Sequence, residues 1–360
     1  MSTQRVSPVL STSLWSLARI ASFPGMRALS WDDDLLYASR GYTLFRGRMG
    51  ATGIGEDWQQ VGVYRPGWWR TLTSSSRLSF RLFRDGFHAL AVLPSGDLVA
   101  AVAGAIISLV PGETEFQVSH RVLRGTRPLH LAVAPNGHIA WGEYFDNRDR
   151  DEVHIYVSTD RGSRWQVAHT FPKGAIRHVH NIVYDQWADC FWILTGDNAS
   201  ECKILRASCD FRDVEIILSG SQQTRAVALV PAPDGLYFSS DTPLETNHVY
   251  GLDRRGNIRQ LVAISSSSIC GCRVGDAIFF STMIEPSGVN LGREVRMYGS
   301  LDGFQWQQLL AWKKDHWPVR LFQYGNAFLP DGRNTAGLLA ITTIAVKHGD
   351  IETTLWSIET

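Results

Sequence analysis

The densest group of side chains that could perform chemistry is the segment R-H-V-H at residues 177–180. His178 and His180 are two residues apart, so on a strand they would face the same side and could ligate one metal ion. Two further histidines and a glutamine stand at equivalent positions of the internal repeat described below. The alternative is a structural pair, with one imidazole buried and hydrogen-bonded and the other exposed. We predict a divalent metal ion (Mn, Ca or Zn) bound by His88, His130, His180 and Gln323.

Arginine recurs at nearly the same position of successive repeats, just before the first strand of each. The arginines in this pattern are Arg27, Arg84, Arg127, Arg177, Arg225 and Arg320. Rotational symmetry would bring them around one channel mouth, as a cationic funnel suited to carboxylate, sulfate or phosphate groups. The alternative is that they bridge neighbouring repeats through carboxylates. We predict that substrate is bound by Arg84, Arg127, Arg177, Arg225 and Arg320.

Acidic and polar side chains follow the predicted second strands and would share this mouth with the arginines. They lie in the segments 143–147, 195–198, 241–248 and 285–287. Aromatic rings beside charged groups suit sugars, whose faces are apolar and whose edges are polar. The predicted partner is therefore an anionic carbohydrate or another acidic small molecule. Further substrate contacts are expected from Gln222, Asp197, Asp241 and Trp317.

These side chains need a framework that repeats, and the sequence contains one. A pattern of four short apolar strands separated by polar turns aligns seven times, at intervals of roughly 40 to 60 residues. Turn sequences such as P-S-G-D, P-N-G-H and P-D-G separate the first and second strands. We predict an all-β, seven-bladed β-propeller of four-stranded antiparallel blades, with residues 1–360 as one domain. The blades should begin near residues 26, 84, 127, 177, 225, 268 and 320, and a strand at 13–23 should complete the last blade and close the ring.

Two serine–aspartate turns lie between the predicted third and fourth strands. They read S-T-D-R-G-S-R-W at 158–165 and S-L-D-G-F-Q-W at 300–306. The first resembles the Asp-box (BNR) repeat, S-x-D-x-G-x-x-W, of sialidases and many other propellers. The matching residues are Ser158, Asp160, Gly162 and Trp165, then Ser300, Asp302 and Trp306 with the glycine displaced to Gly303. A carboxylate can accept backbone N–H bonds within such a turn. We expect Asp160 and Asp302 to be structural, on the rim opposite the arginines.

The histidines of the predicted metal centre suggest one reaction class. A metal could neutralise the carboxylate of a uronate and acidify its α-proton, and a histidine or tyrosine could remove that proton in a β-elimination. The composition is similar to that of propeller polysaccharide lyases of the oligogalacturonate lyase type, which use a His-rich metal centre. The candidate catalytic residues are His180, His178, Tyr144 and Glu143.

Two other functions remain open. A sialidase-like glycoside hydrolase would use the arginines and an adjacent Tyr–Glu pair, for which Glu143 and Tyr144 are available. The Arg-Ile-Pro signature usual in that family is absent, because Ala21 follows Arg19 and Ile20. The third possibility is a recognition propeller that binds a glycan or a protein without chemistry.

Composition limits the classes of partner. Lys+Arg and Asp+Glu number 35 each, so no net charge favours nucleic acid or an anionic membrane. The five cysteines lack zinc-ligand spacing and are expected to be free thiols in a reducing compartment. No apolar stretch approaches the ~18 residues of a membrane-spanning helix, and the N-terminus has no long apolar core. The expectation is a soluble, cytoplasmic protein without nucleic-acid or membrane partners.

Overall fold

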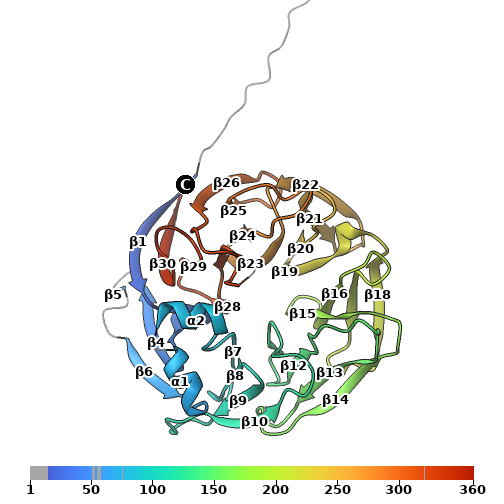
Figure 1. Cartoon of the computed structure of the whole chain (residues 1–360). Coiled ribbons are helices and arrows are strands. Elements are labelled where there is room, and N and C mark those ends of the chain that lie inside the picture. The colour runs from blue at the N-terminus through green and yellow to red at the C-terminus, as the bar shows by residue number, and fades with distance from the viewer. Residues whose placement is uncertain (1–14, 51–52, 55–57, 75, 320) are drawn as a thin grey trace, which may run out of the picture.

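The computed structural model describes residues 15–360, except residues 51–52, 55–57, 75 and 320. Its sheets stand side by side around a central axis, like the blades of a propeller (Figure 1). The described residues form seven sheets, each built on four antiparallel strands. The chain is therefore an all-β, seven-bladed propeller, which confirms the predicted fold class.

The blades follow one another along the chain, each running from the axis outwards. The first contains β2 (Arg27–Asp33), β3 (Leu35–Arg40), β4 (Thr43–Gly50) and β6 (Gln59–Val63), with β5 (Gly53–Ile54) beside β4. The second contains β7 (Ala89–Val92), β8 (Leu98–Val102), β9 (Ala105–Leu109) and β10 (Gln117–Arg121). The third contains β11 (Ala132–Val133), β12 (Ile139–Gly142), β13 (Val153–Ser158) and β14 (Gln166–Phe171). The fourth contains β15 (His178–Asp185), β16 (Cys190–Gly196), β17 (Lys203–Ala207) and β18 (Val214–Ser219).

The remaining blades complete the circle. The short 3₁₀ helix η1 (Gln222–Thr224) precedes the fifth, which contains β19 (Ala226–Ala232), β20 (Gly235–Ser240), β21 (Asn247–Asp253) and β22 (Ile258–Ile264). The sixth contains β23 (Ser268–Val274), β24 (Ala277–Thr282), β25 (Glu294–Ser300) and β26 (Gln307–Lys313). The seventh contains β27 (Asn326–Phe328), β29 (Leu339–Ile344), β30 (Glu352–Glu359) and β1 (Ser16–Pro24).

The core lies between neighbouring blades. Every residue of β8, β16, β20 and β24 is buried, because the second strand of a blade is covered on both faces. The outer strands are half exposed, as in β14 and β26. Between the third and fourth blades, Ile155 packs in one cluster with Phe191 and Ile193. Each such side chain contributes about 1.5–3 kcal/mol by burial, so packing between blades fixes the positions of the strands that line the axis.

The ring is closed by β1, the first strand of the chain, as the sequence predicts. It pairs antiparallel with β30, for example Leu17 with Ile358. Residues 13–14 of the predicted closing strand lie outside the described residues. A second junction was not predicted: β28 (Asp331–Asn334) pairs in parallel with β2 of the first blade. The P-D-G sequence read as a turn inside the seventh blade therefore leads into this extra strand, and β27 pairs with β29 instead.

Two short helices stand on the rim before the second blade, where the sequence pattern predicted no helix. They are α1 (Trp68–Ser74) and α2 (Arg77–Phe83), visible in blue beside β7 in Figure 1. Ser76 caps α2 by accepting a hydrogen bond from the Ser79 backbone N–H. Arg81 is buried and forms ion pairs with Asp315 and Asp350 of the last two blades. No helix of the described residues is long and apolar enough to cross a membrane.

The serine–aspartate turns contain the local hydrogen bonds expected of them. Asp160 Oδ1 accepts the Ser158 hydroxyl at 2.9 Å and the Arg164 backbone N–H at 2.9 Å. Asp302 Oδ1 likewise accepts the Ser300 hydroxyl and two backbone N–H groups of its turn. Both carboxylates are used within their turns, which join the third and fourth strands of their blades.

Candidate functional site

One rim of the propeller collects the polar side chains that the sequence singled out. The antiparallel register pairs His178 with Gly196, Ala226 with Ser240, and Ser268 with Thr282. The start of each innermost strand therefore lies beside the end of the second strand of the same blade. Arginines that precede first strands and acidic residues that follow second strands consequently share one mouth of the axis.

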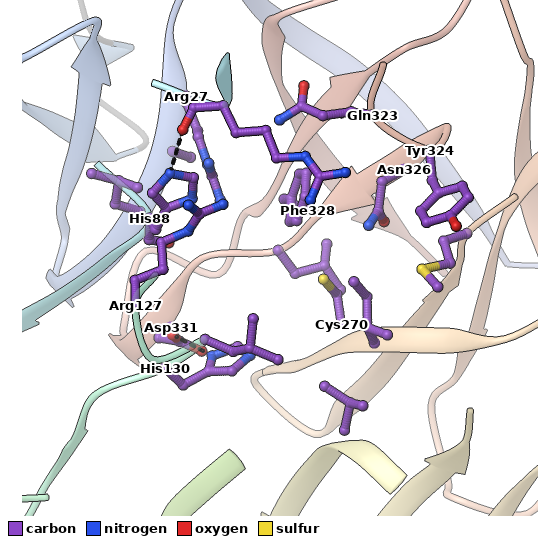
Figure 2. A pocket seen from close by; sticks show the side chains of 18 of the residues that line it. Arg27, His88, Arg127, His130, Cys270, Gln323, Tyr324, Asn326, Phe328 and Asp331 are labelled. Carbon is purple, nitrogen blue, oxygen red and sulfur yellow. Dashed lines mark hydrogen bonds and ion pairs between the residues drawn. The ribbon is translucent and has the colours of Figure 1, made fainter. Parts of the chain in front are cut away.

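A cavity of about 200 Å³ opens at this mouth, lined mainly by the first, second, third and seventh blades and also by residues of the fifth and sixth. Figure 2 shows Arg27, Arg127 and His88 gathered at one side of it. The charged and titratable residues of its lining are Arg27, Arg84, Arg127, His88, His130, Cys270, Tyr324 and Asp331. The cavity is smaller than the roughly 300–1,000 Å³ of drug-sized ligand sites, so it suits one small charged group or one sugar unit.

The three arginines of the cavity lie at different depths. Arg27, on β2, is 8% exposed, Arg127 is half-buried, and Arg84 is exposed at the end of α2. Among the described residues, none of the three forms an ion pair with a carboxylate. Burial lowers the pKa of Arg27 to about 10. Burial and the charges of Arg27 and Arg84 lower the pKa of Arg127 to about 9. Arg27 and Arg127 are therefore still charged at neutral pH and repel each other, and a bound anion would relieve that repulsion.

The two histidines of the cavity differ in their contacts. His88 Nε2 lies 2.8 Å from the Arg84 backbone carbonyl, which can only accept, so Nε2 carries the hydrogen and Nδ1 is free to accept. Burial and the charges of Arg127 and Arg27 hold the pKa of His88 well below its ordinary value, and the ring is neutral. His130 Nδ1 lies 3.1 Å from Asp331 Oδ2, and Figure 2 shows this pair below the arginines.

The opposite wall of the cavity carries amides and apolar groups. Arg27 stacks its guanidinium over the Phe328 ring at 4.6 Å, and its Nε has no hydrogen-bond partner in the described part of the chain. Asn326 Oδ1 and Gln323 Oε1 are also buried without a partner there. Unpaired buried polar atoms are costly, so these amides favour a ligand with hydroxyl or N–H groups.

A second cluster lies across the channel, at the ends of the third to fifth blades. His178 and His180 project from β15 toward Asp197, which follows β16. Arg177 Nη1 lies 2.9 Å and Arg225 Nη2 lies 3.2 Å from the Asp197 carboxylate. Burial alone would raise the pKa of Asp197, but its contacts with the two histidines and the charge of Arg225 outweigh burial and hold it well below its ordinary value.

The predicted metal ligands are not brought together as a set of four. His88, His130 and Gln323 line the cavity, whereas His180 lies in the second cluster. In the described residues, the group with metal-ligand spacing consists of His178, His180 and Asp197. His130 and His180 stand on neighbouring blades, but His180 turns toward the fifth blade, where its Nδ1 meets the Ala226 carbonyl, whereas His130 turns toward Asp331.

Several other predicted site residues form hydrogen bonds, ion pairs or ring contacts with neighbouring residues. Glu143 is buried, pairs with Arg124 and accepts the His154 backbone N–H at 2.8 Å. Gln222 donates to the Asp197 carbonyl and accepts the Thr242 hydroxyl. Trp317 packs edge-on against Phe322 and stacks beside His316. The predicted substrate ligand Arg320 lies outside the described residues.

Tyr144 and Asp241 do face the second cluster. The Tyr144 ring lies 4.4 Å from that of His178, and burial together with the Asp197 charge raises the pKa of Tyr144 to about 12. Asp241 is buried, and its Oδ2 lies 3.6 Å from Arg225 Nη2. Burial raises the pKa of Asp241 to about 7, more than the Arg225 charge lowers it.

Sequence reasoning named some of the cavity residues and missed others. Arg127 and Arg84 were proposed as substrate ligands, and both line the cavity. Arg27 belongs to the same arginine repeat and was left out of the predicted site, although it is the most deeply buried of the three. Asn326 and Asp331 carry no repeat signal, because the β27–β28 connection departs from the pattern of the other blades.

Comparisons with known proteins identify the fold alone. No protein-family model matches the chain, and no curated protein matches it. Among solved structures, the WD40 β-propeller domain of Doa1 is 13% identical, with a TM-score of 0.57 over 95% of this chain and 97% of that one. A chain of the Mitotic Checkpoint Complex is 8% identical, with a TM-score of 0.58 over the whole of both chains. The GH74 xyloglucanase from Xanthomonas campestris is 17% identical, with a TM-score of 0.53 over 82% of this chain and 47% of that one.

Proposed function

We propose that this propeller binds a small anionic ligand, one acidic sugar unit or a comparable hydroxylated acid, in the cavity at the channel mouth. The observation that carries the proposal is the group of three guanidinium ions without carboxylate partners among the described residues. Such groups match the planar oxygens of carboxylate, sulfate and phosphate. The unpaired amide oxygens of Asn326 and Gln323 favour hydroxyl groups on the same ligand.

Binding can be tested by calorimetry with matched ligands. Glucuronate and galacturonate should bind, and glucose and galactose should bind much more weakly because they lack the carboxylate. Arg127→Gln should weaken uronate binding about 10- to 100-fold, as expected for losing one hydrogen bond to a charged group. Arg121→Gln is the matched control, because Arg121 is exposed on the outer strand β10. Equal binding by both variants, or equal affinity for uronates and neutral sugars, would contradict the proposal.

We propose β-elimination as the reaction, if the bound acid is turned over. A glycoside hydrolase of the usual kind needs a pair of carboxyl groups. Of the described residues that line the cavity, Asp331 alone is a carboxylate, and it is paired with His130. A lyase needs positively charged groups that neutralise the uronate carboxylate, and a base that removes the α-proton. The arginines supply the first, and His88 supplies an imidazole with a free Nδ1.

The elimination step balances without an external reagent. His88 Nδ1 takes the α-proton, the electrons of that C–H bond form the C=C bond, and the bond to the leaving oxygen breaks. The leaving oxygen then takes a proton from water, and the hydroxide that remains takes the proton from His88 Nδ1, which restores the neutral base. The expected divalent metal (Mn, Ca or Zn) stays a prediction, since the residues with suitable spacing lie outside this cavity.

Turnover can be separated from binding by one substitution. On a panel of uronate oligosaccharides, the unsaturated product of elimination is detected by its ultraviolet absorbance. His88→Ala should abolish product formation and keep uronate binding within a few-fold, whereas the exposed control His348→Ala should change neither. Binding without any product in the wild-type protein would favour the recognition propeller over the lyase.

A further inference from the structure

The cluster of His178, His180 and Asp197 contains three electron-pair donors that point at one another. His178 Nε2 and His180 Nε2 are 3.1 Å apart. Asp197 Oδ1 lies 3.3 Å from His180 Nε2 and 3.6 Å from His178 Nε2. Both imidazoles are almost fully buried, and the Asp197 side chain is 21% exposed.

The hydrogen bonds of the outer ring nitrogens fix the protonation of the inner ones. His178 Nδ1 lies 3.0 Å from the Phe145 carbonyl, and His180 Nδ1 lies 2.9 Å from the Ala226 carbonyl. A carbonyl can only accept, so both Nδ1 atoms carry hydrogen. In a neutral imidazole the lone pair is then on Nε2. With both imidazoles neutral, two lone pairs and a carboxylate oxygen would face one another, so the group needs a cation between these atoms, either a shared proton or a metal ion.

The charges around the cluster also favour a cation. Four carboxylates lie in or beside it: Asp146, Asp197, Asp241 and Glu285. Three guanidinium groups, Arg148, Arg177 and Arg225, pair with them. Asp241 Oδ1 and Glu285 Oε2 are buried and have no partner in the described residues. Acidic side chains therefore outnumber arginines here by one, in contrast to the cavity across the channel.

We propose that His178 Nε2, His180 Nε2 and Asp197 Oδ1 bind one Zn²⁺ ion. A tetrahedral zinc site with bonds of about 2.0–2.1 Å has ligand atoms roughly 3.3 Å apart, close to the observed 3.1, 3.3 and 3.6 Å. Two imidazoles and one carboxylate suit zinc better than Ca²⁺, which takes oxygen ligands. The contacts from each Nδ1–H to a backbone carbonyl are those that orient histidine ligands in metal sites.

The local backbone is shaped to leave room for these rings. A Cβ on Gly196 would lie 2.3 Å from His180 Cε1, so glycine is required where the imidazole crosses the end of β16. The ion would be reached from the exposed side of Asp197, beside the Tyr144 ring. Three protein ligands leave a fourth position of the metal for water or substrate. This proposal does not depend on ligand binding by the arginine cavity.

Metal binding by the full-length protein tests the proposal directly. Protein stripped with a chelator and dialysed should take up one Zn²⁺ per chain, measured by calorimetry and elemental analysis. Co²⁺ in place of Zn²⁺ should give the visible absorption of a four-coordinate site. His178→Ala and His180→Ala should each weaken Zn²⁺ binding by at least about 100-fold. His348→Ala is the matched control, because His348 is an exposed histidine outside the cluster.

A substitution that keeps all three ligands guards against a folding artefact. Gly196→Ala should displace the His180 ring and weaken Zn²⁺ binding, while uronate binding in the arginine cavity and the far-ultraviolet circular dichroism stay unchanged. The proposal is overturned if the wild-type protein binds less than about one Zn²⁺ per chain. It is also overturned if nitrogen NMR of the metal-free and zinc-treated protein shows the same protonated His178–His180 pair, because a shared proton would then be the cation.

Discussion

Replacing Arg27 by methionine should stabilise the protein and weaken its binding of anions. Methionine is an unbranched, flexible side chain that replaces the aliphatic part of the arginine but removes a buried charge. Burial lowers the pKa of Arg27 from 12.5 to about 10, which means that the folded state disfavours the charged form relative to the unfolded chain. At pH 7 the arginine is still charged, so its burial reduces the free energy of unfolding.

The magnitude follows from the contacts of Arg27. A pKa that falls from 12.5 to about 10 corresponds to about 3 kcal/mol, at ~1.4 kcal/mol for each tenfold change in proton affinity. Methionine would lose the hydrogen bond to the His88 carbonyl, worth about 1 kcal/mol. It would also lose the cation–π contact with Phe328, worth about 1 kcal/mol. We therefore expect Arg27→Met to raise the free energy of unfolding by about 1 kcal/mol in the absence of a ligand.

Thermal unfolding with and without glucuronate measures both effects. Without ligand, Arg27→Met should have the higher melting temperature. A ligand at 100 times its Kd stabilises by about 2.7 kcal/mol, so glucuronate should raise the melting temperature of the wild type, and this rise should largely disappear in Arg27→Met. Glucose and Arg121→Met serve as controls for general solute and substitution effects. A lower melting temperature of Arg27→Met without ligand, together with an undiminished response to glucuronate, would refute the reasoning.

Three further predictions concern stability. Asp241 has a folded-state pKa of about 7, above that of the unfolded chain, so its contribution to stability falls as the pH rises from about 4 to 7. In Asp241→Asn the melting temperature should therefore depend less on pH in this range. Parallel curves for the variant and the wild type would contradict this prediction. Asp160→Ala removes two hydrogen bonds of the serine–aspartate turn and should cost about 1–2 kcal/mol in chemical denaturation without changing uronate affinity; a lost affinity would give Asp160 a role in binding. A shortened chain beginning at Met26 leaves the edge of β30 unpaired and should elute as aggregates in size-exclusion chromatography, whereas a monomer as stable as the full chain would show that β1 is dispensable.

The channel mouth has two electrostatic halves, and this division explains why the repeat pattern was only partly informative. In the cavity half, arginines of the first, second and third blades meet without carboxylate partners among the described residues. In the other half, Arg177 and Arg225 pair with carboxylates that follow second strands. The arginines therefore lie around an open cavity on one side of the ring and pair with carboxylates on the other side. These arginines stand at the same position of the repeat, and the residues of the neighbouring blade determine whether an arginine has a carboxylate partner.

The sequence by itself determined the blades and the rim. Strand alternation, glycine turns and the serine–aspartate turns are local properties, because side-chain direction and turn geometry depend on a few adjacent residues. They were sufficient to predict seven blades, closure by β1, and the rim that carries Arg127, His178 and His180. The sequence did not predict helices α1 and α2 or the strand β28, because their contacts are with distant segments. Arg81 of α2 contacts Asp315 and Asp350, and Asp331 of β28 pairs with Ser30.

Only the tertiary structure decided which polar groups meet. His180 was expected to join His88 and His130 at equivalent positions, but it lies with His178 and Asp197, which come from adjacent strands of one blade. Glu143 was predicted to be a catalytic residue, but its carboxylate forms an ion pair with Arg124. Charge and hydrogen-bond partners depend on distances of a few ångströms between segments far apart in the chain. The repeat in the sequence predicts at which position of its blade a residue lies, and the packing of the blades determines the distances between residues.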